Sequence, residues 1–501
     1  MTDDSFFSLL SPRIDAARGK PFLTGPDGRS RTYREIAALA HAMAGALADA
    51  GARPGDRIAA QVEKSAENVA LYLASLLGGF VYLPLNTAYT DEELAYFIAD
   101  AEPAVFVADP ARAGATPAGP RVLTLDANGR GSLIDAATAA APLAPVPRVA
   151  DDLAVILYTS GTTGRPKGAM ISQRNLASNA SALHAIWGFR DGDVLLHALP
   201  IFHIHGLFVA LNTAMLNGSE VLFPPKFDAG EARRLLPRAS VMMGVPTFYT
   251  RLLADADFSA EDCRSVRLFI SGSAPLTPET FRAFEARTGH RILERYGMSE
   301  AGMIASNPLE GERIAGTVGY ALPDVEIRVT KDGRALPLGE AGVVEVRGPN
   351  VFKGYWRNPE KTAAEFRDGG WFSTGDIGFL CDDGRLTLSG RAKDLVIVGG
   401  YNVYPKEIED VLDALPGVAE AAVIGVPHPD MGEGVVAILV SSAGSPASPP
   451  LTDEALTRAV SVLARFKQPR KFIWADALPR NAMGKVQKTI LREQYAGVFQ
   501  R

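Results

Sequence analysis

The chain has 501 residues, of which 47% are hydrophobic and 22% charged, and its 51 lysines and arginines against 57 aspartates and glutamates give a formal net charge of −6. This length is too great for one hydrophobic core, so at least two domains are expected. The charge balance argues against a nucleic-acid-binding protein. The two cysteines, Cys263 and Cys381, have no metal-ligand spacing and cannot form a disulfide framework, which favours a reducing compartment.

Neither the first residues nor the apolar stretches predict export or membrane insertion. The segment MTDDSFFSLL carries acidic residues where a signal peptide needs basic ones. The longest apolar stretch, residues 70–85, is interrupted by Gly78, Gly79 and Pro84 and is shorter than the ~20 residues of a membrane helix. We expect a buried helix followed by a strand there, and a cytoplasmic protein.

In chain order, the first strong signal is an Ala-rich helix over residues 32–51, with Thr32 as N-cap candidate, Glu35 three residues later and Gly51 at its end. Strands and helices then alternate, which predicts stacked α/β layers. Helices are expected at residues 175–187, at 207–216 and from Pro246, and strands at residues 153–158, 194–198, 220–223, 239–245 and 266–271.

The sequence pattern changes twice after these layers. Residues 316–388 contain short strands and turn residues, which predict an antiparallel subdomain. The last ~110 residues have the size of a separate domain and read as helix, strand, strand, a polar loop at 441–452, helix and strand. We therefore predict an α/β fold with a large N-terminal domain (1–391) that includes a β-rich subdomain, and a small α+β C-terminal domain (392–501). The Ala/Pro-rich segment 136–149 is expected to be a surface linker.

A loop rich in glycines and hydroxyls follows the apolar run LAVILY. It is not a Walker A loop, because Arg165 and Pro166 separate Gly164 from Lys167. Glycines still let backbone N–H groups approach an anion closely, and hydroxyls add donors, so a phosphate-binding loop is predicted. Its residues are Thr159, Ser160, Gly161, Thr162, Thr163, Gly164 and Lys167.

Four later segments accompany this loop: LERYGMSEAGM (293–303), GWFSTGDIGFL (370–380), GRAKDLVIVGGYNVYPKEIE (390–409) and LPRNAMGKVQK (478–488). Together the five segments resemble the signature motifs of the acyl-adenylate-forming (AMP-binding) superfamily, which includes acyl-CoA synthetases, luciferases and adenylation domains of peptide synthetases. The resemblance spans almost the whole chain. It implies the superfamily's fold, with a mobile small domain, and a reaction in two steps. A carboxylate attacks the α-phosphate of ATP and releases pyrophosphate, and the thiol of coenzyme A then splits the acyl-AMP.

The resemblance also implies ATP, Mg²⁺ and coenzyme A as small-molecule partners. Glu300 and Thr159 would hold Mg²⁺, a hard cation that prefers oxygen ligands. Tyr296 would offer its ring face to adenine, Asp376, in a tight turn, would accept from the ribose hydroxyls, and Arg391 would contact ribose or phosphate. Further cofactor contacts are expected from Ser273, Ala274, Pro275, Glu294, Arg295, Gly297, Met298 and Ser299.

Lys485 is the residue on which the implied chemistry depends most. The matching lysine of the superfamily reaches in from the small domain and bridges the carboxylate and the α-phosphate. One charge at ~4 Å is worth about 4 kcal/mol at an effective dielectric of about 20, or roughly two to three decades in rate. The small domain would then rotate about Lys393, and coenzyme A would enter beside Gly399 and Gly400. Acetylation of Lys485 would remove its charge, so a lysine acetyltransferase and deacetylase are expected partners.

The acid must be chosen by the segments LPIFHIHGLFVALN, MGVPTFYTRLL and SGSAPL, which resemble those of malonyl-CoA synthetases. A dicarboxylate brings a second charge that is costly to bury unpaired, and the planar fork of arginine suits it. Arg251, four residues after Thr247 on the helix from Pro246, is the candidate, with Ser273, His203 and Met303 completing the pocket. Malonate is favoured, with methylmalonate tolerated.

His203 and His205 are expected to share one face of a strand, with His203 shaping the acyl pocket and no metal bound there. The expected catalytic residues are Lys485, Glu300, Lys167 and His203. The alternatives are a short-chain monocarboxylate such as acetate or propionate, or another acid, with the same chemistry; a luciferase-type oxidative enzyme, disfavoured by the short polar pocket and the absent S-K-L signal; and a non-enzymatic nucleotide-binding protein, disfavoured by the intact charged residues. A peptide-synthetase module is disfavoured because no carrier domain follows.

Overall fold

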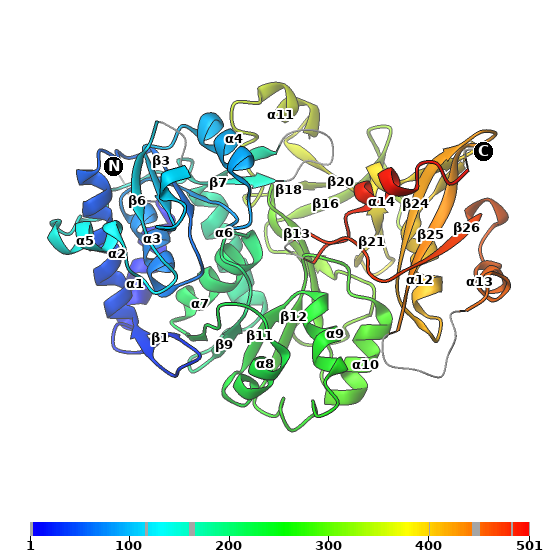
Figure 1. Cartoon of the computed structure of the whole chain (residues 1–501), viewed down its shortest axis with the longest axis horizontal. Helices are drawn as coiled ribbons and strands as arrows, with labels where there is room; N and C mark the ends of the chain where they lie inside the picture. The colour runs from blue at the N-terminus through cyan, green and yellow to red at the C-terminus, as the bar shows by residue number, and fades with distance from the viewer. Residues whose placement is uncertain are drawn as a thin grey trace.

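The computed structural model of the protein describes residues 4–115, 119–159, 166–399, 401–442, 451–481 and 484–499. Within these ranges, no helix combines the length and the apolar content that a membrane span requires. Figure 1 shows the N-terminal helices and strands at one end of the molecule and the last strands, β24 (Val418–His428), β25 (Gly432–Ser441) and β26 (Lys471–Ala475), at the other.

A six-stranded sheet in the order β6-β5-β3-β4-β7-β8 forms the first layer and ends in the phosphate-loop hairpin. Its strands are parallel except β8, which pairs antiparallel with β7. They are β3 (Arg57–Gln61), β4 (Val81–Pro84), β5 (Val105–Ala108), β6 (Arg121–Thr124), β7 (Leu153–Thr159) and β8 (Lys167–Ser172). The helices that accompany them are α2 (Tyr33–Asp49), α3 (Ala66–Leu77), α4 (Asp91–Ala101) and α5 (Ser132–Ala139).

Two helical predictions in this layer are confirmed, and the linker prediction is partly wrong. Thr32 caps α2 and forms a reciprocal capping box with Glu35, which satisfies two backbone donors at the helix start. The apolar stretch over residues 70–85 forms the buried helix α3 and then β4. The predicted linker at 136–149 is partly wrong, because residues 136–139 still belong to α5, where Leu133 and Ala137 are buried.

A nine-stranded sheet in the order β15-β14-β13-β12-β11-β9-β10-β1-β2 forms the second layer. Its strands are β1 (Pro21–Thr24), β2 (Ser30–Thr32), β9 (Val194–His197), β10 (Glu220–Leu222), β11 (Val241–Gly244), β12 (Leu268–Ser271), β13 (Leu293–Met298), β14 (Gly302–Ser306) and β15 (Tyr320–Ala321). The central strands are parallel, as the alternation predicted. The associated helices are α1 (Phe6–Ala16), α6 (Gln173–Ile186), α7 (Asn212–Asn217), α8 (Ala229–Leu235), α9 (Pro246–Ala254) and α10 (Pro278–Thr288).

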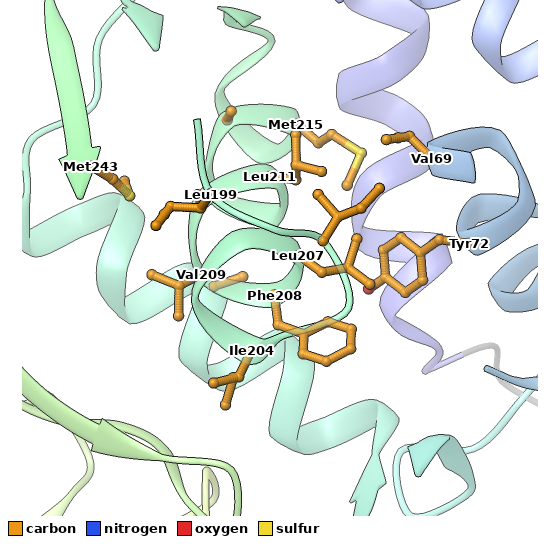
Figure 2. Close-up of a cluster of buried hydrophobic side chains, with 14 of the residues drawn as sticks. Val69, Tyr72, Leu199, Ile204, Leu207, Phe208, Val209, Leu211, Met215 and Met243 are labelled. Carbon is orange, nitrogen blue, oxygen red and sulfur yellow. The ribbon is translucent and has the colours of Figure 1, made fainter. Parts of the chain in front are cut away.

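The helix expected at 207–216 is not regular. A π-helix, η2 (His205–Leu211), precedes the short helix α7. Figure 2 shows Leu207 and Phe208 beside Tyr72 of α3, and Met243 of β11 on the opposite side of the π-helix. The rings of Tyr72 and Phe208 lie 5.7 Å apart between centroids. The π-helix is therefore built into the hydrophobic core.

The predicted antiparallel subdomain is confirmed. Its sheet runs β17-β16-β18-β20-β19, with β21 paired to β20. The hairpin turn at Asp332 and Gly333 has positive φ at both residues, as a two-residue turn requires. The elements are β16 (Glu326–Lys331), β17 (Arg334–Ala335), β18 (Gly342–Arg347), α11 (Pro359–Glu365), β19 (Phe366–Arg367), β20 (Trp371–Leu380) and β21 (Leu386–Arg391).

The C-terminal part has its own hydrophobic core on both faces of its sheet. Val435, Ala437 and Leu439 of β25 belong to one buried cluster, and the alternate residues Val436 and Ile438 belong to another. The helix–strand–strand order is confirmed. The remaining elements are η4 (Ala392–Asp394), β22 (Val396–Val398), β23 (Tyr401–Val403), α12 (Pro405–Asp413), α13 (Asp453–Val460) and α14 (Lys488–Tyr495). The domain boundary at 391/392 stays a prediction.

Candidate active site

The phosphate-loop hairpin places Lys167 beside a buried tyrosine. Thr159 ends β7 and pairs with Lys167 at the start of β8; Ser160, Gly161, Thr162, Thr163 and Gly164 lie outside the described residues. The ammonium of Lys167 is 5.7 Å from the ring centroid of Tyr355, whose hydroxyl donates to Glu300 Oε1 at 3.1 Å. Burial and the charge of Lys361 lower the pKa of Lys167. Two of the predicted site residues thus meet at one tyrosine.

Glu300 lies in the turn between β13 and β14 and is 7% exposed. The first six residues of its motif, Leu293–Met298, form β13. Burial raises the pKa of Glu300. The described ranges hold no cluster of three or more His, Cys, Asp or Glu that could bind a metal by itself. A Mg²⁺ ion that arrives with a nucleotide needs only one or two protein oxygens besides phosphate and water, and Glu300 with the Thr159 hydroxyl fits that pattern.

Tyr296, Asp376 and Arg391 form one connected group across three strands. The Tyr296 hydroxyl donates to Asp376, and Arg391 Nε forms an ion pair with the other carboxylate oxygen at 2.7 Å. Asp376 was expected in a tight turn, and this is wrong: β20 continues through it, and it pairs with Arg391 of β21. The two strands therefore hold a buried carboxylate, 5% exposed, against a guanidinium.

Lys485 reaches this group from the C-terminal part. Its short loop is closed by hydrogen bonds in both directions between Asn481 and Lys485, each 3.0 Å long. At Gly484 the loop touches the large part, since a Cβ there would lie 3.4 Å from Thr247 Oγ1 on α9. Although Lys485 is an exposed residue, desolvation of its ammonium, with the charges of Arg391 and Lys393, lowers its pKa to about 8.

The two histidines of FHIHG do not lie on a strand, contrary to the prediction. His203 precedes η2 and His205 begins it, because the chain turns sharply after β9. His205 Nδ1 lies 3.1 Å from Ser273 Oγ, and the backbone N–H of His205 donates to His203 Nδ1 at 3.2 Å. Ser273 has a strained φ of +73°. Burial and the charges of Arg295 and Lys485 lower the pKa of His203 to about 4, so it is neutral near pH 7.

Arg295 is a buried cation that forms no ion pair with the described residues. It is 3% exposed, and its Nε and Nη2 have no hydrogen-bond partner in the part of the chain that the structure describes. A Cβ atom on Gly272 would lie 2.4 Å from its Cζ, so glycine there leaves room for the guanidinium. Burial lowers the pKa of Arg295 to about 9. A buried, unpaired guanidinium is costly, and its N–H groups are available to an anionic ligand.

Sequence reasoning missed this role and assigned Arg295 only as a cofactor contact. The neighbouring Glu294 acts on Arg295 only at a distance and forms no described ion pair with it, because adjacent strand residues point to opposite faces. Glu294 Oε1 instead accepts from the Leu276 N–H at 3.1 Å, and burial raises the Glu294 pKa to about 7. A single sequence carries no signal for such a missing partner.

Arg251, the predicted arginine of the acyl pocket, is exposed in the last turn of α9. It lies close enough to Arg480 of the C-terminal part to affect it electrostatically. Burial lowers the pKa of Arg480 most, and the charge of Arg251 lowers it further. Met303 is 1% exposed, and its backbone bonds to Asn179 in both directions. The role of Arg251 in binding the acid stays a prediction.

The remaining predicted residues lie around these groups. Ala274 and Pro275 follow Ser273, and Gly297, Met298 and Ser299 lie at the end of β13. Lys393 is exposed in η4, and Gly399 is exposed with a φ of +56°. Gly400 lies outside the described residues.

Comparison with known proteins gives consistent matches over the whole chain. Residues 12–356 match the family described as AMP-binding enzyme, and residues 407–485 match the AMP-binding enzyme C-terminal domain. The crystal structure of ATP-bound MatB from Rhodopseudomonas palustris is 51% identical, with a TM-score of 0.95 over 100% of both chains. A malonate–CoA ligase of Arabidopsis thaliana is 35% identical over 88% of this chain and 78% of its own. A sulfoacetate–CoA ligase of Cupriavidus necator is 34% identical over 97% of both.

Proposed function

Because the chain belongs to the AMP-binding enzyme family, as an AMP-forming acid–thiol ligase that uses ATP and coenzyme A, we propose that its acid is malonate. The reaction is malonate + ATP + coenzyme A → malonyl-CoA + AMP + diphosphate, through malonyl-AMP. Methylmalonate, with one added methyl group, is a second acid of the same charge.

Arg295 is the observation that supports this proposal most directly. One carboxylate of malonate must face the nucleotide, so the other enters the pocket as a second negative charge. The two unpaired N–H groups of Arg295 suit that carboxylate, and Ser273 and His205 lie alongside. Acetate or propionate would leave the guanidinium buried and unpaired, which disfavours a monocarboxylate.

The other site residues then have distinct tasks in adenylation. Lys167 holds the β- and γ-phosphates, and Lys485 bridges the reacting carboxylate and the α-phosphate while the carboxylate oxygen attacks phosphorus and pyrophosphate leaves. Mg²⁺, held by Glu300 and Thr159, would neutralise phosphate charge. Neutral His203 lies beside the acid and near Lys485, and the charge of Lys485 lowers the pKa of His203. Asp376 and Arg391 orient the ribose.

In the second step the thiol sulfur attacks the acyl carbon and AMP leaves. The small domain would rotate about Lys393, and coenzyme A would pass Gly399 and Gly400. Acetylation of Lys485 by a lysine acetyltransferase would remove the bridging charge and stop adenylation, and a deacetylase would restore it.

Sulfoacetate is a second candidate acid, because a sulfonate is also an anion that the N–H groups of Arg295 can bind. The C. necator relative that is named for this acid matches 97% of this chain. Malonate and sulfoacetate place their two charges similarly, so the site geometry favours a dianion in both cases.

A substrate panel tests the proposal. Pyrophosphate release is measured with ATP, coenzyme A and malonate, methylmalonate, sulfoacetate, succinate, acetate or propionate. We expect kcat/KM for malonate to exceed that for acetate by about a hundredfold or more, because only malonate can form a buried ion pair with Arg295. Equal values for malonate and acetate would remove the proposed role of the second charge, and a higher value for sulfoacetate would favour the second candidate.

A further inference from the structure

A half-buried lysine bonds to the histidine that ends β9 and is used by none of the steps above. The Lys64 ammonium, just after β3, donates to the carbonyl oxygens of His197 at 2.7 Å and Pro224 at 2.8 Å. It also lies 3.1 Å from His197 Nδ1 and 4.2 Å from the ring centroid of Phe223. No carboxylate among the described residues forms an ion pair with it. Lys64 is thus held by neutral acceptors and a ring face.

The geometry fixes the protons of this group. His197 Nε2 lies 2.8 Å from the Gly206 carbonyl oxygen, which can only accept, so Nε2 carries the proton. His197 Nδ1 is then unprotonated and accepts from Lys64. Lys64 therefore donates to three acceptors, which requires the ammonium form. Burial and the charge of Lys64 lower the pKa of His197 to about 3, which agrees with a neutral imidazole.

Gly206 connects this chain of hydrogen bonds to the pocket. It is the second residue of η2, directly after His205, and a Cβ on it would lie 2.0 Å from the Pro200 carbonyl oxygen. The backbone is therefore tightly folded where His205 reaches Ser273. π-Helical turns are uncommon and often occur at functional sites. The later residues Leu207 and Phe208 are held by apolar packing (Figure 2), whereas the start of η2 depends on Gly206 and its neighbours.

We propose that Lys64 and His197 are positioning residues for acid binding: Lys64 sets the tautomer of His197, His197 holds Gly206, and Gly206 presents His205 to Ser273 in the acyl pocket. This inference rests on the proposed function for the location of the acid, but not for its identity. Among the described residues, the printed hydrogen bonds of these two side chains go to each other and to the carbonyls of His197, Gly206 and Pro224, so we expect their effect to be confined to the acid.

The test compares the variants Lys64→Met, His197→Leu and the double variant. We expect each single variant to raise the KM for malonate about tenfold, while the KM for ATP stays within about twofold. Because both residues act through the same carbonyl, the double variant should resemble either single variant rather than multiply their effects to about a hundredfold. His184→Leu is the matched control, since the half-buried His184 bonds to Asn217 at 3.0 Å, away from the site, and should leave both KM values unchanged.

Equal increases in the two KM values, or multiplied effects in the double variant, would overturn the proposal. If a variant does not fold, ¹⁵N NMR of histidine-labelled wild-type protein decides: the Nε2–H tautomer of His197 is expected, and the Nδ1–H tautomer would contradict the chain of hydrogen bonds. If the enzyme activates another acid instead of malonate, the KM for that acid is measured. In that case the proposed substrate fails while the positioning role is still tested.

Discussion

Replacing Arg295 by methionine should change activity and stability in opposite directions. Arg295 is 3% exposed and two of its nitrogens lack partners among the described residues, so the free protein holds a buried charge that no described ion pair compensates. Its pKa falls from 12.5 to about 9. At 1.36 kcal/mol per unit this corresponds to roughly 4 to 5 kcal/mol of destabilisation near neutral pH, where the group is charged in both the folded and the unfolded chain.

Methionine removes that penalty but leaves the second carboxylate of malonate without a partner. Breaking a buried ion pair by removing one member costs about 3 to 5 kcal/mol. The kcat/KM for malonate should therefore fall by roughly two to four decades. The kcat/KM for butyrate, an apolar acid of similar length, should fall much less, so the variant should lose its preference for the diacid.

The assay is pyrophosphate release with malonate and butyrate, together with the midpoint of thermal unfolding. Arg267→Met is the contrasting control, because Arg267 pairs with the buried Asp193 through two hydrogen bonds, of which Nε–Oδ1 is 2.9 Å. Its loss should lower the unfolding midpoint, whereas Arg295→Met should raise it. A malonate kcat/KM within tenfold of wild type, or a lowered midpoint for Arg295→Met, would refute the reasoning.

Four further outcomes are expected. Lys485→Ala should abolish formation of malonyl-AMP but largely spare thioester formation from supplied malonyl-AMP, and equal loss of both half-reactions would contradict this division. Because the Lys485 pKa is lowered to about 8 and the charged form is needed, kcat/KM for adenylation should fall as pH rises through about 8; a profile that stays flat to pH 10 would argue against the ammonium. Gly272→Ala should raise the malonate KM, because its Cβ would displace the guanidinium of Arg295, and an unchanged KM would show that the guanidinium can move without effect. Arg251→Met should raise the malonate KM by less than about tenfold, because exposed charges are screened by solvent; a loss equal to that of Arg295→Met would make Arg251 an equal partner.

Local rules predicted much of the fold. Thr32 and Glu35 marked the start of α2, Pro246 marked α9, and the turn residues of 316–388 indicated the antiparallel subdomain, because capping and turn preferences act over a few residues. Periodicity could not distinguish the π-helix from an α-helix, since both bury an apolar run. It also did not show that β20 continues through Asp376, because that strand is stabilised by its pairing with β21.

The site was predicted from sequence motifs. The differences between the predicted and the observed site arise from contacts between segments that are distant in the sequence. Lys485 and Asp376 were identified separately, and the structure brings them within electrostatic range. Arg251 was chosen for its helix face, whereas burial and a missing partner distinguish Arg295, and both depend on what folds around them. The roles of these residues remain predictions that the variants above can test.

The sheet of the C-terminal part carries apolar clusters on both of its faces. Most of the apolar side chains described in this domain are therefore buried within the domain itself, although Ile397, Tyr401, Val462 and Ile490 are exposed. Its core would stay covered if the domain moved away from the large domain. We expect the two orientations of the C-terminal domain, one for adenylation and one for thioester formation, to differ little in free energy. The bound ligand would then determine which orientation is populated.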